Sequence, residues 1–202
     1  MFDSDLTSGV VEVICGPMFS GKTEELLRRI RRAEIAKQKV TVFKPAIDNR
    51  YGQEQVCSHI GHSLSANVIN GSTQILDKVI GDTKVVAIDE IQFFDDDIID
   101  IVSILADRGY RVICAGLDQD HMGAPFGPMA SLLAVADKVD KLYAVCTVCG
   151  GPATKSLRVN TSDQKQVLVG EFDYYEARCR KHYQGKRPSP ELQASLNLFG
   201  EK

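Results

Sequence analysis

Residues 15–29 read CGPMFSGKTEELLRR, and the spacing of their glycines, lysine and threonine indicates a phosphate-binding loop. Part of it fits the phosphate-loop pattern G-x-x-x-x-G-K-[ST]. The matching residues are Gly16, Pro17, Met18, Phe19, Ser20, Gly21, Lys22 and Thr23. An apolar, β-branched run precedes the loop at residues 10–15, and Leu26, Leu27 and Ile30 follow it at helical spacing. A strand, the loop and a helix in this order are the context that the pattern requires, so a chance glycine-rich turn is disfavoured.

The chemistry of such a loop follows from its position at the start of a helix. Backbone N–H groups turn inward around phosphate oxygens, and the helix N-terminus adds positive potential. Lys22 is expected to reach the β- and γ-phosphates of a nucleotide, and Thr23 to offer its hydroxyl to Mg²⁺. The loop alone does not say what receives the phosphate.

The rest of the first 144 residues continues the alternation of strands and helices. Further β-rich runs occupy residues 39–43, 85–88 and 111–115, and helical periods cover residues 72–80 and 95–108. Strands of nearly continuous apolar residues are typical of a parallel sheet covered on both faces. We therefore expect an α/β nucleotide-binding domain over residues 1–144, a separate small module over residues 145–185, and a mobile tail over residues 186–202.

Two adjacent carboxylates follow the apolar run KVVAI. Asp89 and Glu90 would emerge at the carboxyl end of a buried strand, where open α/β sheets bind ligands. Asp89 is the expected partner of Mg²⁺, and Glu90 can accept a proton from an attacking water or hydroxyl group. The alternative for Glu90 is a solvated acid at a helix start.

The small module carries two pairs of metal-ligating residues. Cys146 and Cys149 form C-x₂-C, and Cys179 and His182 form C-x₂-H. Two pairs of such ligands suit tetrahedral Zn²⁺ and leave no open position for catalysis, so the zinc is expected to be structural. A redox C-x₂-C pair is the alternative, but the strand-helix context of thioredoxin is missing. The module has no long helical period before residues 174–183.

Composition narrows the functional classes. The chain has 202 residues, 44% of them hydrophobic, and no apolar run approaches the roughly 18 residues of a membrane span. The N-terminus shows no basic-then-apolar export pattern, so we expect a cytoplasmic protein without a membrane partner. The net charge of -3 argues weakly against a nucleic-acid partner.

The combined motifs resemble those of the type II thymidine kinase family. They are GPMFSGKTEELLRR, AIDEIQFFD, GLDQDHMGAPFGPM and the C-x₂-C…C-x₂-H module, in family order from about residue 10 to residue 183. The resemblance implies a RecA-like parallel sheet flanked by helices, with a small zinc-binding lasso domain that closes over the nucleoside. It also implies a homotetramer and feedback inhibition by dTTP.

Matching positions imply individual roles. Glu90 would be the general base that takes the proton from the deoxyribose 5′-hydroxyl, and Thr23 and Asp89 would hold Mg²⁺. Besides the phosphate loop and Asp89, the implied nucleotide-binding residues are Asp48, Arg50 and Gln92. The implied thymidine-binding residues are Met18, Phe93, Leu117, His121, Gln166, Val167, Leu168, Val169, Gly170 and Tyr175. Residues 166–170 would bind the base mainly through backbone groups, and Tyr175 would reach the sugar.

The sequence departs from the family pattern at His121 and Met122, where the family often has a phenylalanine and then a basic residue. An imidazole still stacks on a base, over less area. Without the family resemblance, Met18, Phe93 and Leu117 would each be interpreted as an ordinary core residue.

The leading hypothesis is transfer of the γ-phosphate of ATP to the 5′-hydroxyl of thymidine, and of deoxyuridine as well, in nucleotide salvage for DNA synthesis. One alternative is a zinc-bearing RecA-like ATPase that acts on DNA, which the acidic charge disfavours. Another is an inactive nucleotide switch whose zinc module binds a protein, which would leave Glu90 without a role.

Overall fold

A six-stranded sheet forms the centre of the computed structural model, which describes residues 9–47, 55–57, 63–79, 81–159 and 174–184. Its strand order is β5-β2-β6-β7-β1-β8, and all neighbouring strands run parallel. The strands are β1 (Val10–Cys15), β2 (Lys39–Pro45), β5 (Asn67–Ile69), β6 (Thr83–Ile88), β7 (Arg111–Gly116) and β8 (Lys138–Lys141). This arrangement confirms the predicted RecA-like α/β fold class.

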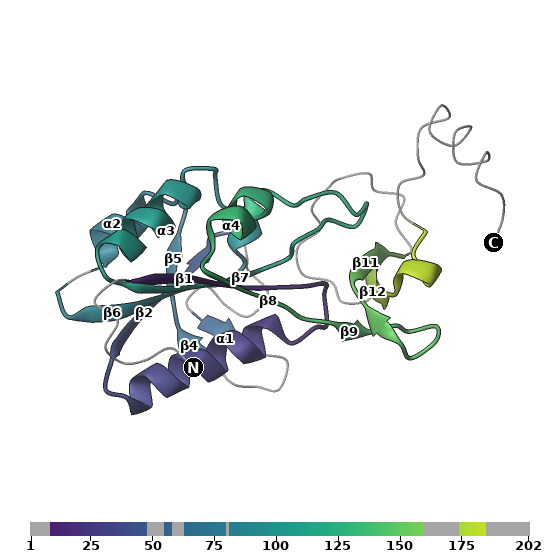
Figure 1. The fold of residues 1–202 in the computed structure, drawn as a ribbon, viewed down its shortest axis with the longest axis horizontal. Helices are drawn as coiled ribbons and strands as arrows, with labels where there is room; N and C mark the ends of the chain where they lie inside the picture. The colour runs from purple at the N-terminus through teal and green to yellow at the C-terminus, as the bar shows by residue number, and fades with distance from the viewer. Residues whose placement is uncertain (1–8, 48–54, 58–62, 80, 160–173, 185–202) are drawn as a thin grey trace.

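Both faces of the sheet are covered by helices (Figure 1). Side chains alternate along a strand, so in β7 Val112 and Cys114 join one hydrophobic core while Ile113 joins the other. The first core packs against α2 (Gln74–Lys78), α3 (Ile98–Asp107) and α4 (Met129–Val135). The second packs against α1 (Lys22–Ile35). Burial on both faces explains why these strands read as nearly continuous apolar runs.

The chain after β8 forms smaller sheets. β9 (Ala144–Val145) pairs with β10 (Pro152–Ala153), and β11 (Lys155–Arg158) pairs with β12 (Tyr175–Arg178), both antiparallel. A short 3₁₀ turn, η3 (Arg180–His182), follows β12. The core of these sheets consists of small residues, Ala144, Cys146, Ala153 and Ala177, with Cys179 packed against them. So small a core needs a further source of stability.

Two regions differ from the sequence-based expectations. The helical period predicted over residues 174–183 is wrong, because residues 175–178 form β12 and hydrogen-bond to β11. The strands β5 and β8 were not predicted, since both are short and lie at the edges of the sheet. A separate hairpin, β3 (Gln55–Cys57) with β4 (Ser63–Ser65), was not predicted either.

The helices are too short or too polar to cross a bilayer. This holds for every helix in the described part of the chain.

Candidate functional site

The phosphate loop connects β1 to α1 at the carboxyl edge of the sheet. Gly16 has φ 147°, and a Cβ there would lie 2.6 Å from the carbonyl oxygen of Leu142. Gly21 has φ 82° and precedes the first turn of α1. Both positions therefore require glycine, one for close backbone approach and one for a left-handed conformation.

The polar side chains of the loop lie along its own backbone. The Lys22 ammonium and the Ser20 hydroxyl both donate to the carbonyl oxygen of Pro17, each at 2.8 Å. Thr23 Oγ1 donates to Asp89 Oδ2 at 3.4 Å, so the loop meets the end of β6. The two oxygens predicted to hold Mg²⁺ are thus brought together.

The acidic pair lies directly after β6. Asp89 is anchored because its N–H donates to the Phe43 carbonyl oxygen of β2 and its Oδ1 accepts from the Glu90 N–H, each at 3.0 Å. Glu90 has φ 51°, a left-handed backbone conformation that is uncommon for a glutamate, and its residue is 9% exposed. Such backbone strain persists where the surrounding structure holds a residue in place, often at functional sites.

Gln92 links this pair to the end of β7. It lies in η1 (Ile91–Phe93) and is 2% exposed. Its Nε2 donates to Glu90 Oε2 at 2.5 Å, and its Oε1 accepts from the Leu117 N–H at 3.0 Å. A Cβ at Gly116 would lie 2.5 Å from Gln92 Oε1, so the close approach requires glycine. In the structure the Gln92 side chain thus contacts Glu90 and Leu117, and nucleotide binding by Gln92 stays a prediction.

The predicted thymidine-binding residues of the central domain lie at the same edge. Phe93 follows Gln92 in η1, and Leu117 is the first residue after β7. The Phe93 ring packs edge-on against Phe126, with ring centroids 5.4 Å apart and planes at 86°. Sequence reasoning missed Phe126, although it lies inside the quoted motif.

The loop after β7 is held in one conformation by its own acidic residues. Asp118 forms an ion pair with Lys141 at 2.7 Å. Asp120 Oδ1 accepts from the N–H groups of Met122 and Ala124 at 2.9 and 3.0 Å. His121 therefore lies in a loop whose backbone is hydrogen-bonded to the Asp120 side chain.

The environment of His121 favours the neutral imidazole. Partial burial, and then the charge of Arg158, lower the pKa of His121 below its usual value. The His121 carbonyl oxygen accepts from the Tyr183 hydroxyl at 2.7 Å. An uncharged ring at neutral pH suits the predicted contact with an uncharged base.

The small module contacts the central domain at the phosphate loop and at the loop after β7. The Met18 N–H donates to Ser156 Oγ at 2.9 Å, and Lys155 Nζ donates to Gln119 Oε1 at 2.5 Å. Sequence reasoning missed Ser156, Lys155 and Tyr183, because no motif marks residues whose partners lie so far away along the chain.

Tyr175, predicted to reach the sugar, lies at the start of β12. Its hydroxyl accepts from Arg158 Nη2 at 2.9 Å, and the Arg158 guanidinium lies 5.5 Å from the ring centroid. Arg158 is a further candidate that the sequence did not mark.

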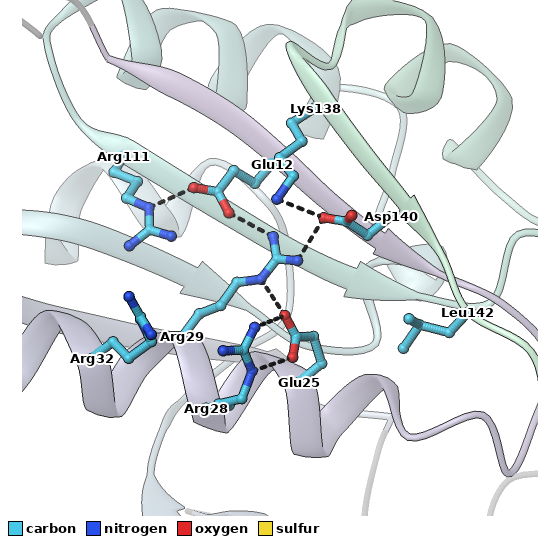
Figure 2. Close-up of a pocket in the computed structure, with 9 residues that line it drawn as sticks. All are labelled: Glu12, Glu25, Arg28, Arg29, Arg32, Arg111, Lys138, Asp140 and Leu142. Carbon is cyan, nitrogen blue, oxygen red and sulfur yellow. Dashed lines mark hydrogen bonds and ion pairs between the residues drawn. The ribbon is translucent and has the colours of Figure 1, made fainter. Parts of the chain in front are cut away.

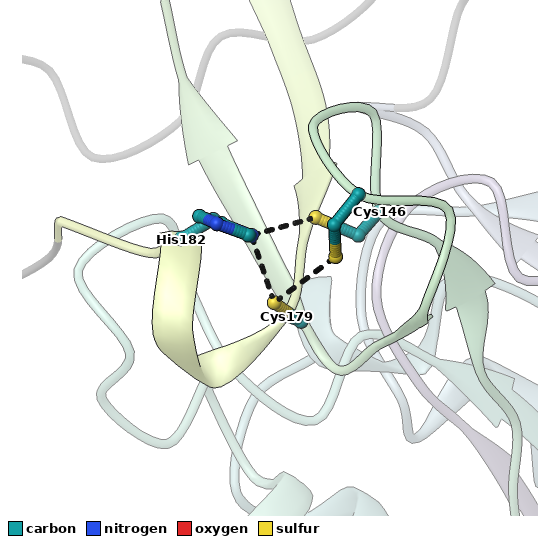
Figure 3. A group of neighbouring side chains, drawn as sticks. Cys146, Cys179 and His182 are labelled. Carbon is teal, nitrogen blue, oxygen red and sulfur yellow. Dashed lines mark hydrogen bonds between the residues drawn. The ribbon is translucent and has the colours of Figure 1, made fainter.

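Four side chains of the module converge as a metal site would require (Figure 3). The ligand atoms of Cys146, Cys149, Cys179 and His182 all lie within 4.8 Å of one another. The Cys149 and Cys179 sulfurs are 3.8 Å apart, close to the edge of about 3.8 Å in a zinc tetrahedron with Zn–S bonds near 2.3 Å. Cys146 Sγ and Cys179 Sγ lie 3.7 and 3.3 Å from His182 Nδ1. This cluster can bind zinc.

The ionisation of Cys146 also suits a metal ligand. Burial opposes the thiolate, but backbone N–H groups of Cys179, Val148 and Cys149, together with His182, lower the pKa of Cys146 to about 5. The thiolate is the form that binds metal, so the lowered pKa favours metal binding by Cys146.

The remaining predicted site residues are Asp48, Arg50 and those of the backbone-binding stretch. Asp48, Arg50 and residues 166–170 lie outside the described residues.

One comparison with known proteins bears on the chain as a whole. A family model described as "Thymidine kinase" matches residues 9–183. The match includes the phosphate loop, the acidic pair and all four residues of the metal-binding cluster.

Proposed function

The chain belongs to the thymidine kinase family, and from this premise we propose that it transfers the γ-phosphate of ATP to the 5′-hydroxyl of thymidine, giving dTMP and ADP. We include deoxyuridine among its substrates and place the reaction in nucleotide salvage. The observation that carries the proposal is the hydrogen bond between Gln92 and Glu90, directly after β6. The phosphate loop lies beside this pair, because Thr23 contacts Asp89.

In this proposal Glu90 accepts the proton of the 5′-hydroxyl as it attacks. The Gln92 amide donates to the Glu90 carboxylate and so holds it in position for this role. The second end of Gln92 is held by the Leu117 N–H, which fixes the direction of the carboxylate. A fixed base contributes through position as well as through its proton affinity.

The nucleotide phosphates would lie on the N–H groups of the loop. Lys22 would leave the Pro17 carbonyl and turn to the β- and γ-phosphates, where its charge offsets the charge that develops during transfer. Thr23 and Asp89 fit a shared Mg²⁺, because both offer hard oxygen atoms and these already lie in contact. Bound there, Mg²⁺ would neutralise phosphate charge.

The nucleoside would lie between the central domain and the zinc-bearing module. We assign its binding to Met18, Phe93, Leu117, His121, Tyr175 and residues 166–170, and assign Asp48 and Arg50 to the nucleotide. Zinc on the cluster of Cys146, Cys149, Cys179 and His182 is proposed as structural, since all four tetrahedral positions are filled by protein. The module at residues 145–185 is proposed as a unit of its own, with residues 186–202 as a tail.

Family membership also supports a homotetramer, feedback inhibition by dTTP and a cytoplasmic location. We propose these three properties on that ground alone.

The direct test incubates the purified protein with Mg-ATP and one nucleoside at a time, and separates the products by chromatography. Thymidine monophosphate, with or without deoxyuridine monophosphate, is the expected product. ATP hydrolysis only in the presence of DNA, with no nucleoside phosphorylated, would instead support a DNA-dependent ATPase.

Glu90→Gln tests the base. We expect ATP binding to be retained and turnover to fall by about 10²–10⁴, the usual contribution of a general base. Glu34→Gln is the matched control, since Glu34 is exposed on α1. Undiminished turnover in Glu90→Gln would remove Glu90 from this role.

A further inference from the structure

A network of charged side chains lies between α1 and the sheet, on strands β1, β7 and β8 (Figure 2). Arg29, which is 5% exposed, is at its centre. Its guanidinium contacts Glu12 at 2.5 Å, Asp140 at 2.6 Å and Glu25 at 2.8 Å. Arg29 is thus fully used in joining the helix to two strands.

The carboxylates of this network are all engaged by more than one cation. Besides Arg29, Glu12 accepts from Arg111 at 2.6 Å, Glu25 from Arg28 at 2.5 Å, and Asp140 from Lys138 at 3.1 Å. The lining of the pocket comprises three carboxylates and five cations, namely Glu12, Glu25, Asp140, Arg28, Arg29, Arg32, Arg111 and Lys138, together with Leu142. The formal charge of the lining is therefore +2, within a protein whose net charge is -3.

Arg32 and Arg111 offer N–H groups that the network does not use. Among the residues that the structure describes, Arg32 has no hydrogen-bond or ion-pair partner, and Arg111 uses only Nε, toward Glu12. Figure 2 shows the two guanidinium groups pointing toward one another on one side of the Arg29 network. Two like charges that face each other repel, and an anion between them would turn this repulsion into attraction.

The space beside these groups is large enough for a ligand. The pocket has a volume of about 500 Å³, within the range of small-molecule sites. Guanidinium groups match the oxygens of a phosphate through paired N–H donors, which makes arginine the preferred residue for such anions.

We propose that this pocket is a second anion site, which binds a phosphate group through Arg32 and Arg111. It is separate from the phosphate loop, because Arg32 lies ten residues beyond Lys22 on α1, about 15 Å along a helix axis. It takes no part in the phosphoryl transfer proposed above. The phosphate comes either from inorganic phosphate or from a nucleotide.

Equilibrium dialysis with radiolabelled inorganic phosphate tests the site, with the phosphate loop first saturated by Mg-ADP. We expect wild-type protein to retain phosphate binding under these conditions. Arg32→Gln should weaken it about tenfold or more, as expected for loss of charge-assisted hydrogen bonds. Arg32 is exposed, so the variant should fold; Arg111→Lys, which keeps the charge but loses the fork, should weaken binding as well.

Arg31→Gln is the matched control, because Arg31 is an exposed neighbour on α1 that does not line the pocket. Equal phosphate binding by wild type, Arg31→Gln and Arg32→Gln would overturn the proposal, as would equal weakening in both variants. AMP as a competitor distinguishes the sources. Displacement far stronger than by unlabelled phosphate identifies a nucleotide, and equal displacement identifies phosphate alone. Nucleoside phosphorylation, measured separately, reports on the proposed function and not on this site.

Discussion

Gln92 is the residue whose two hydrogen bonds join the proposed base to the nucleoside side of the site. Gln92→Leu keeps the approximate shape but removes the donor to Glu90 and the acceptor for the Leu117 N–H. We expect kcat to fall by about tenfold or more, since one lost hydrogen bond to a charged group costs about 1.5–3 kcal/mol. We also expect the KM values for ATP and thymidine to change by less than kcat, because the lost hydrogen bonds hold the proposed base.

Comparing the changes in kcat and in KM separates orientation of the base from general structural damage. Gln38→Leu, at an exposed position, is the control and should change neither quantity. An unchanged kcat, or a fall in kcat matched by an equally large rise in KM, would contradict the role assigned to Gln92.

Local sequence motifs predicted the positions of some of the site residues. The positions of the phosphate loop and of Glu90 were predictable because each directly follows an apolar strand, the loop after β1 and the acidic pair after β6. Ser156 was not, since its partner Met18 lies 138 residues away. The orientation of Gln92 depends on Gly116, a close approach that only the folded chain brings about.

Helix α1 is attached to the sheet by Arg29 as well as by apolar packing. Arg29→Met would leave the Glu12 carboxylate, 2% exposed, with Arg111 as its remaining cation. We expect the free energy of unfolding at pH 7 to fall by about 3 kcal/mol, the lower end for a broken buried ion pair. Urea denaturation measures it, with Arg31→Met as the control on the exposed face.

The difference between wild type and Arg29→Met should shrink in acid. Hydrogen bonds from Arg28 and Arg29 hold the pKa of Glu25 below its usual range. Burial opposes ionisation of Asp140, but hydrogen bonds from Arg29 and Lys138 lower its pKa as well. A depressed native pKa stabilises the fold above the ordinary value near pH 4, and this contribution is lost as the pH falls further. A difference that stays constant from pH 7 to pH 3.5 would contradict this account.

The elements were predictable in proportion to their burial. β1, β6 and β7 lie inside the sheet and read as apolar runs, whereas β8 alternates between half-buried and exposed residues. The strand β12 contains Glu176 and Arg178 and depends on pairing with β11, so its local sequence favoured the wrong period. Tertiary pairing outweighs weak local preference in such strands.

At the level of the whole molecule, we expect a metal bound by the Cys146–Cys149–Cys179–His182 cluster to keep the small module in contact with the phosphate loop. Cys149→Ser, or removal of the metal by a chelator, should unfold a module whose own core is small. Ser156 and Tyr183 would then leave Met18 and His121, so we expect KM for both substrates to rise.

Metal analysis by mass spectrometry, paired with KM measurements, checks this. We expect about one zinc per chain in the wild type and in the control Lys181→Gln, an exposed position beside the ligands. Full activity in protein with far less than one zinc per chain would show that the module needs no metal.

The place of β1 in the sheet has a consequence for synthesis. β1 is made before both of its partners, which are β7, beginning at Arg111, and β8, beginning at Lys138. At 5–20 residues per second a ribosome needs roughly 5–20 s to reach β7. During that interval β1 is present without either of its neighbours in the sheet, and unpaired strand edges of this kind are prone to aggregate.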